Sequence, residues 1–398
     1  MAEGREKAIT YHLDVARRIG ILTGGGDVPG LNSVIKEVVY RATENDCEVL
    51  GIRRGWKGLT HLDCTSAESR AEYLLPLDRA NTRTIDRYGG TVLHSSRVSP
   101  TRMKSLPEFL DPETFPKDDG AWDLSAHVLK NIESLRLDSL IVIGGDGTLS
   151  FAFKLEKLGV KVIAIPKTMD NDVQGTEYSV GFSTAITRAT AAIQRQRTTV
   201  ASHERVGIFR VFGRDSGFTA LYTAYVTSLR CAIPEFKVNL DKLVELLIKE
   251  KRDTPSNYVM FVLSEGACWE GYEPEVLPAD AYGHRRRPSV AEALEVEVTR
   301  RSGEECTVSD LTYDLRSGEA DFVDKMIAGT YGNLAMDAIL EGRSGVMTAL
   351  IEGCYSLVPI PDPALGPRMV DVATLYNRDR YRPNYGRKIG LPVFLTRA

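Results

Sequence analysis

The chain has 398 residues, of which 43% are hydrophobic, so it is long enough to form two domains with buried cores. Its formal net charge of −4 is too small to favour nucleic acid or an anionic membrane surface as a partner. Its six cysteines and six histidines lack the spacing of zinc ligands or a disulfide framework, and no apolar stretch approaches membrane-spanning length, so we expect a cytoplasmic protein.

The first predicted elements are a strand, a glycine-rich turn and a helix. After an N-terminal arm, residues 18–23 are predicted as an apolar strand, residues 24–30 as the turn and residues 31–42 as a helix with regularly spaced apolar side chains. Residues 49–52 are predicted as the next strand and residues 55–59 as a loop. The turn could hold a phosphate at the helix N-terminus, although the same sequence also suits an ordinary strand–helix connection.

Two further strands are predicted in the middle of this half of the chain. Residues 99–122, rich in Pro, Lys and Asp, are expected to form an exposed insertion, followed by a helix at 124–137. The β-branched runs 140–143 and 162–165 are predicted as parallel strands. Because such strands end at the same edge of a sheet, the segments that follow them should open into a shared cleft.

The remaining chain continues the alternation of helices and strands. A helix is predicted at 184–198, strands at 206–211, 258–263 and 307–311, and a loop or insertion at 274–289. This order predicts an α/β fold with two doubly wound, three-layer α/β/α domains. We expect mostly parallel sheets, with the active site in the cleft between the domains.

Gly144-Gly145-Asp146-Gly147-Thr148 follows the 140–143 strand. An aspartate among glycines at a strand end has room around it and can reach a phosphate-bound Mg²⁺ directly or through water. The alternative is an aspartate that only caps the next helix. NAD kinases and diacylglycerol-type lipid kinases carry the same motif, so it leaves those activities open.

Thr168-Met169-Asp170-Asn171-Asp172 follows the 162–165 strand. Asp170 is expected to accept the proton of an acceptor hydroxyl, and Asp172 to orient that hydroxyl or contact a metal. The alternative is a turn without chemistry. Arg205 and Arg214 lie before and after the next strand, where arginine suits bidentate binding of a sugar phosphate. Together these features predict phosphoryl transfer to an alcohol.

The chain resembles the phosphofructokinase family over roughly residues 18–345. The matching segments follow family order: Leu22–Asn32, Gly89–Thr91, Ser95–Arg97, Gly144–Thr148, Pro166–Asp172, Gly181–Ala185, His203–Arg205, Gly213–Gly217 and Ser264–Ala267. The resemblance implies Mg²⁺-dependent transfer of a phosphoryl group to the 1-hydroxyl of fructose 6-phosphate. The product would be the fructose 1,6-bisphosphate of glycolysis.

The resemblance also implies a role for each matching residue. The catalytic set is Asp170 as general base, Thr168, Asp172 and Arg214, with Asp146 as the metal ligand. The donor-binding set is Gly26, Trp56, Arg97, Arg102, Gly147, Thr148 and Lys167. The substrate-binding set is Thr168, Asp170, Arg205, Gly213, Arg214, Glu265, Tyr313 and Arg316. The position of Arg205 typically reaches a neighbouring subunit, which implies a homodimer or homotetramer with shared active sites.

Two positions bear on the phosphoryl donor. Gly147 is the glycine typical of ATP users in the family, whereas pyrophosphate users usually carry an aspartate that would repel the nucleotide α-phosphate. Lys167 is typical of pyrophosphate users, but a lysine can serve either donor. We therefore expect ATP as co-substrate, with pyrophosphate as the alternative.

The chain departs from the family at two substrate positions. Tyr313 stands where histidine is general, and Thr307 stands where a second cross-subunit arginine is common. Another ketose phosphate, such as sedoheptulose 7-phosphate, is therefore an alternative substrate. A catalytically silent sugar-phosphate sensor is the non-enzyme alternative.

The resemblance implies two domains that are each discontinuous in sequence. The donor-binding domain is expected to comprise residues 17–180 plus about 316–365. The sugar-phosphate-binding domain is expected to comprise residues 181–315 plus about 366–398.

Overall fold

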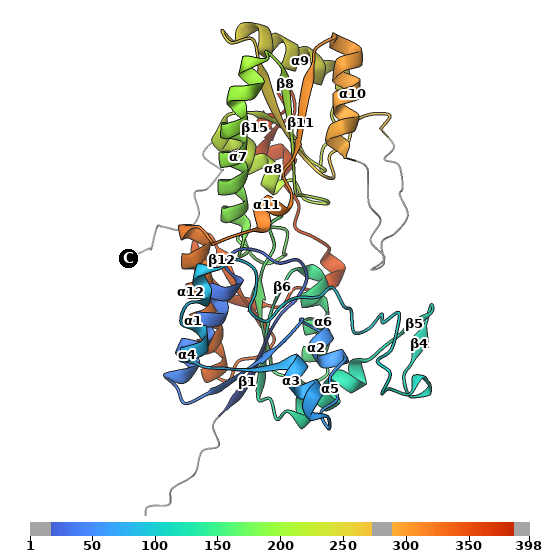
Figure 1. The fold of residues 1–398 in the computed structure, drawn as a ribbon, viewed down its shortest axis with the longest axis vertical. Coiled ribbons are helices and arrows are strands. Elements are labelled where there is room, and N and C mark those ends of the chain that lie inside the picture. Colours follow the sequence, from blue (N-terminus) through green and yellow to red (C-terminus); the bar gives the residue numbers. More distant parts are fainter. Residues whose placement is uncertain (1–16, 273–288, 386–398) are drawn as a thin grey trace, which may run out of the picture.

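A seven-stranded sheet forms the larger domain of the computed structural model, which describes residues 17–272 and 289–385 (Figure 1). The strands follow the order β13-β12-β7-β6-β1-β2-β3, and the two edge strands, β3 and β13, run antiparallel to their neighbours. Their bounds are β1 (Arg18–Thr23), β2 (Glu48–Ile52), β3 (Leu74–Leu77), β6 (Ser139–Gly144), β7 (Val162–Pro166), β12 (Val346–Ile351) and β13 (Cys354–Pro359).

A four-stranded sheet forms the smaller domain, which lies above the larger one in Figure 1. Its order is β11-β8-β10-β9, and each neighbouring pair is parallel. The strands are β8 (Val206–Val211), β9 (Arg230–Ala232), β10 (Val259–Ser264) and β11 (Cys306–Asp310). Two short hairpins pair β4 (Lys117–Asp118) with β5 (Ala121–Trp122) and β14 (Tyr376–Asn377) with β15 (Arg382–Pro383).

Helices cover both faces of the two sheets (Figure 1). The larger domain carries α1 (Leu31–Thr43), α2 (Lys57–Thr60), α3 (Ala67–Tyr73), α4 (Arg79–Thr82), α5 (Ser125–Ser134), α6 (Asp146–Lys157) and α12 (Phe322–Leu340). The smaller domain carries α7 (Phe182–Ser202), α8 (Phe218–Thr227), α9 (Leu240–Asp253), α10 (Val290–Ser302), α11 (Tyr313–Arg316) and α13 (Val372–Leu375). Single 3-10 turns are η1 (Ile85–Arg87), η2 (Pro112–Thr114) and η3 (Pro363–Leu365).

The central strands of the large sheet are buried on both faces, which is why they are continuously apolar in sequence. In β6, Ile141 and Ile143 join the hydrophobic core beneath α1 and α12, whereas Leu140 and Val142 join a second core beneath α6. Successive side chains of a strand point to opposite faces, so each apolar run supplies both cores.

The α/β fold with mostly parallel sheets is confirmed, and the strands expected from the sequence are present within two residues of their predicted bounds. The prediction of a loop at 55–59 is wrong in part, because residues 57–60 form α2. Leu59 is fully buried there, and its backbone N–H donates to the carbonyl of Trp56, which favours a helical turn. The N-terminal arm and most of the 274–289 loop lie outside the described residues.

The two sheets draw on different parts of the chain. Strands of the large sheet come from residues 18–166 and 346–359, and strands of the small sheet from residues 206–310. This division agrees with the expected discontinuous domains, whose boundaries within the connecting segments stay a prediction.

Asp324, near the start of α12, joins the two domains. Its fully buried carboxylate accepts hydrogen bonds from the backbone N–H groups of Gly181 and Thr184, each at 2.8 Å, and so caps the N-terminus of α7. It also accepts hydrogen bonds from the hydroxyl groups of Tyr178, at 2.8 Å, and Thr184, at 2.5 Å. Four hydrogen-bond donors in the segment that connects the two domains therefore share the Asp324 carboxylate as their acceptor.

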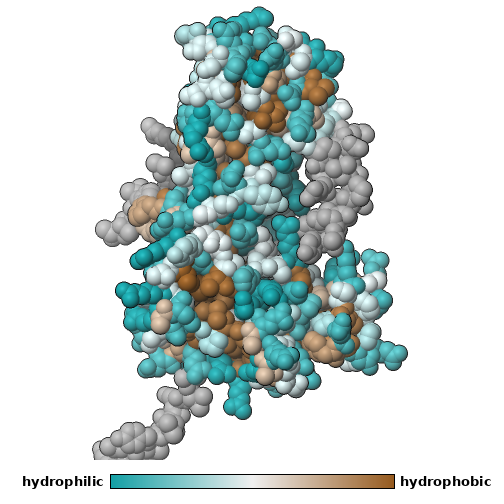
Figure 2. All heavy atoms as spheres, in the orientation of Figure 1, coloured by the Kyte–Doolittle hydropathy of each residue, from teal (hydrophilic) through white to brown (hydrophobic). Residues whose placement is uncertain are grey.

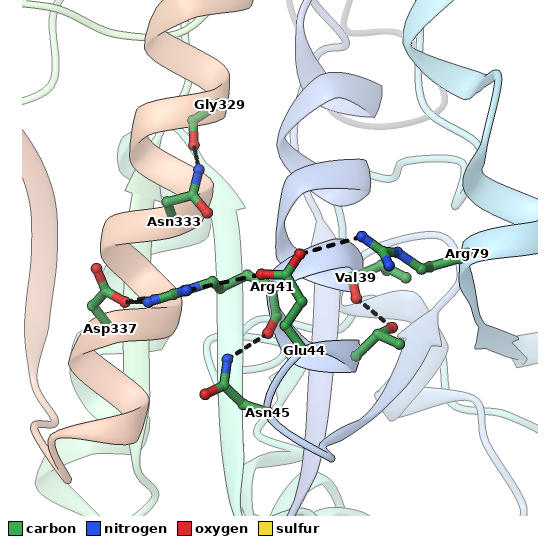
Figure 3. A network of polar contacts seen from close by, with 9 residues as sticks. Val39, Arg41, Glu44, Asn45, Arg79, Gly329, Asn333 and Asp337 are labelled. Carbon is green, nitrogen blue, oxygen red and sulfur yellow. Dashed lines mark hydrogen bonds and ion pairs between the residues drawn. The ribbon is translucent and has the colours of Figure 1, made fainter.

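Solvent-exposed polar contacts join α1 and α12 at the surface of the larger domain (Figure 3). Arg41 donates to Asp337 at 2.9 Å, and Glu44 accepts from Arg79 at 3.2 Å. Such exposed pairs contribute little to stability, so the packing of α1 on α12 rests on their apolar faces.

The face of the molecule seen in Figure 2 is mostly hydrophilic, and hydrophobic side chains gather on the larger domain over the region of α1 and α12. Among the described residues, no helix is both long and apolar enough to cross a membrane.

We expect Asp324→Ala to lower the free energy of unfolding by at least about 3 kcal/mol, because it leaves several buried donors without acceptors. Urea denaturation followed by circular dichroism measures this. Asp337→Ala, which removes the exposed partner of Arg41, is the matched control and should leave the midpoint nearly unchanged. Equal effects of the two substitutions would contradict the role of Asp324.

Candidate active site

Three loops meet at the carboxyl ends of β1, β6 and β7, where open α/β sheets place their ligand sites. The N–H of Gly24, after β1, donates to Ile143 O at 2.9 Å, and the N–H of Lys167, after β7, donates to Gly144 O at 3.0 Å. The N–H of Gly25 donates to Ser96 O at 2.9 Å, which brings the segment before Arg97 to the same place.

Glycine is required where these loops approach one another. A Cβ atom on Gly144 would collide with the side chain of Thr148, which is itself buried between Gly144 and Gly24. At Gly147, in contrast, a Cβ atom would meet nothing within 4 Å. The first turn of α6 therefore has an open position directly after Asp146.

The segment after β7 is held in a fixed shape by its own side chains. The backbone at Asn171 is left-handed, with φ of 53°, and its buried amide donates to Glu177 O at 2.9 Å and accepts from Ser179 N at 2.8 Å. The hydroxyl of Thr168 accepts from Asp170 N at 3.1 Å. This turn presents Asp170 and Asp172 on either side of the anchored Asn171.

The aspartates after β6 and β7 share one electrostatic environment. Burial and then the charge of Asp172 raise the pKa of Asp170 well above its ordinary value, and burial also raises that of Asp172. Burial, Asp172 and Asp215 raise the pKa of Asp146 to about 7. Because Asp172 acts on both Asp146 and Asp170, the two motifs found in the sequence face one common site.

These carboxylates suit a divalent cation. Asp146, Asp172 and Asp215 form no ion pair with any residue that the structure describes. The described part of the chain also holds no set of three or more His, Cys, Asp or Glu side chains arranged to bind a metal. Mg²⁺ is commonly held by one or two carboxylates together with water and substrate phosphates, so Asp146 fits that mode of binding.

Lys167 lies beneath the glycine-rich turn. Its ammonium group is almost completely buried and donates to Gly26 O at 2.7 Å. Burial and then the charge of Arg316 lower the pKa of Lys167 to about 7. A buried cation at this position favours the binding of an anion above the turn.

Residues of the smaller domain approach the aspartates from above. Gly213 O accepts from Gly266 N at 3.0 Å, which places Glu265 beside the loop that carries Arg214. The Arg214 guanidinium lies 3.6 Å from the Glu265 carboxylate, and its charge acts on Asp170. An exposed arginine beside the buried carboxylates is suited to contact a transferring phosphoryl group.

Arg316 connects the expected donor and substrate sets. Its guanidinium donates to Asp27 O at 3.1 Å and lies 4.5 Å over the ring of Phe212. A Cβ atom on Gly26 would collide with this guanidinium, so the close approach needs a glycine. The charge of Arg316 also lowers the pKa of Asp170.

Four expected site residues have surroundings that differ from those of the buried cluster. Trp56 is buried in the core, where its indole N–H donates to Thr148 O at 3.2 Å, so it supports α6 and does not line the cleft. Arg102 is exposed on the insertion, 3.5 Å from Asp119. Tyr313 is 78% exposed. The fourth, Arg205, precedes β8, whereas Arg214 follows the same strand.

The distance along β8 separates Arg205 from the site. Six residues in a strand span about 20 Å, so Arg205 and Arg214 lie at opposite ends of the sheet. Arg205 instead pairs with Glu305 at 2.9 Å. Within one subunit it therefore has no contact with the aspartates.

Sequence reasoning missed the residues that hold the catalytic segment. Asp215 lies in a segment that the family resemblance singled out, yet only its electrostatic effect on Asp146 and Asp172 shows that it faces the site. Thr219, on α8, donates to Met169 O at 2.8 Å, and no local pattern in the sequence signals this contact.

Comparison with known proteins identifies relatives over most of the chain. The family model "Phosphofructokinase" matches residues 18–339. The chain is 36% identical over 349 residues to ATP-dependent 6-phosphofructokinase 3 of Streptomyces coelicolor, covering 87% of this chain and 94% of that protein. It is 34% identical over 347 residues to a pyrophosphate–fructose 6-phosphate 1-phosphotransferase of Dictyoglomus thermophilum, covering 86% and 91%.

Solved structures share the fold at low sequence identity. The pyrophosphate-dependent phosphofructokinase of Nitrosospira multiformis has a TM-score of 0.74 at 16% identity, covering 93% of this chain and 89% of that one. The corresponding enzyme of Marinobacter aquaeolei has a TM-score of 0.72 at 18% identity, with the same coverage.

We expect Asp172→Asn to lower the pKa of the Asp170 carboxyl, because the Asp172 charge is the second largest cause of its rise. A titration of the aspartate carboxyl carbons by ¹³C NMR measures this. Asp215→Asn is the control, since Asp215 acts on Asp146 and Asp172 and should leave Asp170 nearly unchanged. An unchanged pKa in Asp172→Asn would show that the two carboxylates do not share a site.

Proposed function

The chain belongs to the phosphofructokinase family and is a phosphotransferase, and we propose that it transfers the terminal phosphoryl group of ATP to the 1-hydroxyl of fructose 6-phosphate. The observation that carries this proposal is the electrostatic coupling of Asp146, on the donor side, to Asp172 and through it to Asp170. Phosphoryl transfer needs a place for the donor's charge and a proton acceptor beside the alcohol, and these groups supply both.

Each residue of the catalytic segment then has a task. Asp170 accepts the proton of the sugar hydroxyl, and Thr168 and Asp172 orient that hydroxyl. Arg214 neutralises charge on the migrating phosphoryl group. Asp146 would hold a Mg²⁺ ion, which would supply further charge neutralisation when bound.

The raised pKa of Asp170 in the free protein is compatible with a base. The Arg214 and Arg316 guanidinium groups lower the pKa of Asp170, which favours the charged carboxylate that accepts a proton. In a loose transition state the hydroxyl loses its proton late, so positioning matters more than basicity.

Gly147 favours ATP as the donor. The space around its Cα atom is open, so it leaves room for a nucleotide at the N-terminus of α6, where backbone N–H groups attract phosphate. Arg97 adds positive charge, since its field acts on Lys167 and Arg316.

Pyrophosphate is the second candidate donor, and Lys167 is the observation that favours it. A buried cation beneath the glycine-rich turn suits a small, highly charged anion that lies close to the turn. Relatives named for each donor match this chain at similar identity, 36% and 34%.

Fructose 6-phosphate is the acceptor that we propose, with Glu265, Gly213 and Arg316 as its contacts in this subunit. Arg205 would complete the contacts in a homodimer or homotetramer, because it pairs with Glu305 at the other end of β8 from Arg214 in one copy. Tyr313 is a further proposed contact of the sugar, and because it stands where the family generally has histidine, another ketose phosphate is the alternative acceptor. We further propose that the enzyme acts in the cytoplasm, as a glycolytic role requires.

Asp170→Asn is expected to lower kcat by at least about 10²-fold with little change in KM for either substrate, because it removes a positioned base. Steady-state kinetics of the purified protein with Mg²⁺, fructose 6-phosphate and each donor measure this. A fall of less than threefold would rule out Asp170 as the base. Binding of the sugar phosphate by the unaltered protein without turnover would instead support the sensor alternative.

Gly147→Asp is expected to lower kcat/KM for ATP at least about tenfold more than for pyrophosphate. A Cβ atom at this position meets nothing within 4 Å, so we expect the effect of the new carboxylate to be electrostatic and not a loss of folding. Gly147→Ala, which adds a neutral Cβ atom, is the control and should affect the two donors alike. Equal losses with both donors in Gly147→Asp would contradict the argument.

A further inference from the structure

Residues 360–371 return from the larger to the smaller domain after β13, beyond the residues that the family model matches. Sequence reasoning assigned them no function. At Arg368 this return segment contacts the catalytic segment directly. The backbone N–H of Arg368 donates to Asp172 O at 2.6 Å, and its guanidinium donates to Asn171 O at 3.1 Å.

The Arg368 side chain is fixed on its other sides as well. Its guanidinium donates to Glu177 O at 3.3 Å and lies 4.3 Å over the ring of Phe218, the first residue of α8. The Arg368 guanidinium therefore links both ends of the Asn171–Glu177 turn to the smaller domain. The field of Asp172 also acts on this guanidinium, and burial lowers the pKa of Arg368.

The return segment is anchored to the loop that carries Arg214. One oxygen of Glu235 accepts both Val370 N at 2.8 Å and Gly217 N at 2.9 Å. Farther along the chain, Tyr376 is buried and its hydroxyl donates to Cys231 O at 2.6 Å, which fixes the segment to the small sheet. The position of Arg368 is thus determined by the smaller domain.

These contacts bring together three carbonyl groups of the catalytic segment. Those of Asn171 and Asp172 are bound by Arg368, and that of Met169 is bound by Thr219 of α8. The backbone on both sides of Asp170 is therefore held by the domain that also carries Arg214. A shift of about 1 Å in the position of Asp170 relative to Arg214 is enough to lower the rate about 10²-fold in a reaction that depends on the orientation of its groups.

We propose that Arg368 is a positioning residue, which sets the backbone of the catalytic segment relative to the Arg214 loop and thereby places Asp170 for proton transfer. This inference rests on the proposed function of Asp170. On this account Arg368 acts through the backbone: its Nη1 donates to the carbonyl groups of Asn171 and Glu177, and its backbone N–H donates to that of Asp172. Its removal should change the chemical step and leave the binding of both substrates nearly intact.

The test compares kcat and KM of the full-length protein with those of Arg368→Ala, Arg368→Lys and Arg368→Met. In Arg368→Ala we expect kcat to fall at least about twentyfold, with both KM values within threefold of the unaltered enzyme. Arg368→Lys keeps a charge but lacks the planar guanidinium that lies over Phe218, so its kcat should lie between those of the unaltered enzyme and Arg368→Ala. Met369→Ala changes the adjacent, exposed side chain and is the control. Its kcat and KM values should equal those of the unaltered enzyme.

Chemical rescue separates positioning from a merely structural role. Millimolar guanidinium chloride, well below denaturing concentration, should restore at least fivefold activity to Arg368→Ala, whereas methylammonium chloride should not. A kcat within threefold of the unaltered enzyme overturns the proposal. A loss of kcat that guanidinium does not restore, and that accompanies a fall in the melting temperature, also overturns the proposal. If Arg368→Ala does not fold, Arg368→Met, which keeps an aliphatic stem over Phe218, is judged by the same kinetic criteria.

The proposed function fails separately from this inference. If Asp170→Asn is active, or the unaltered protein shows no turnover, the assignment of the base or of the activity is wrong. If Asp170→Asn is inactive while Arg368→Ala keeps full activity, the function stands and only the role of Arg368 is refuted.

Discussion

Two carboxylates that repel each other, Asp170 and Asp172, are held in one buried turn, and the rest of the site is organised around that constraint. Their charges are unfavourable in the free protein, as the raised pKa of each shows. The turn is stable because the side-chain amide of Asn171, a residue with a left-handed backbone, donates to Glu177 O and accepts from Ser179 N. The Arg214 and Arg316 guanidinium groups lower the pKa of Asp170 and so offset part of this cost.

The domain architecture converts this local arrangement into a two-sided site. The larger domain supplies the glycine-lined platform at the ends of β1, β6 and β7, and the smaller domain supplies Arg214. The connecting segments are clamped where they cross: Asp324 caps α7, and Arg368 binds the carbonyl groups of the catalytic segment. Closure of one domain on the other would therefore be transmitted to Asp170 through defined hydrogen bonds.

The sequence predicted what depends on short-range patterns. Apolar runs located seven strands of the two main sheets, but the edge strands β3 and β13 and the strands β9 and β12 were not predicted. The two aspartate motifs follow β6 and β7, where the candidate site lies. Helix α12 was missed because it is apolar around most of its circumference and shows no amphipathic stripe. Trp56 matched a family position near the donor but is enclosed by the core, and Thr219 and Arg368 act through backbone carbonyl groups, which leave no trace in sequence spacing.

The empty space beside Gly147 has a consequence for evolution. Glycine and aspartate can be encoded by codons that differ by a single base, and a Cβ atom at this position would meet nothing within 4 Å. A single mutation could therefore place a carboxylate next to Asp146 while α6 keeps its fold.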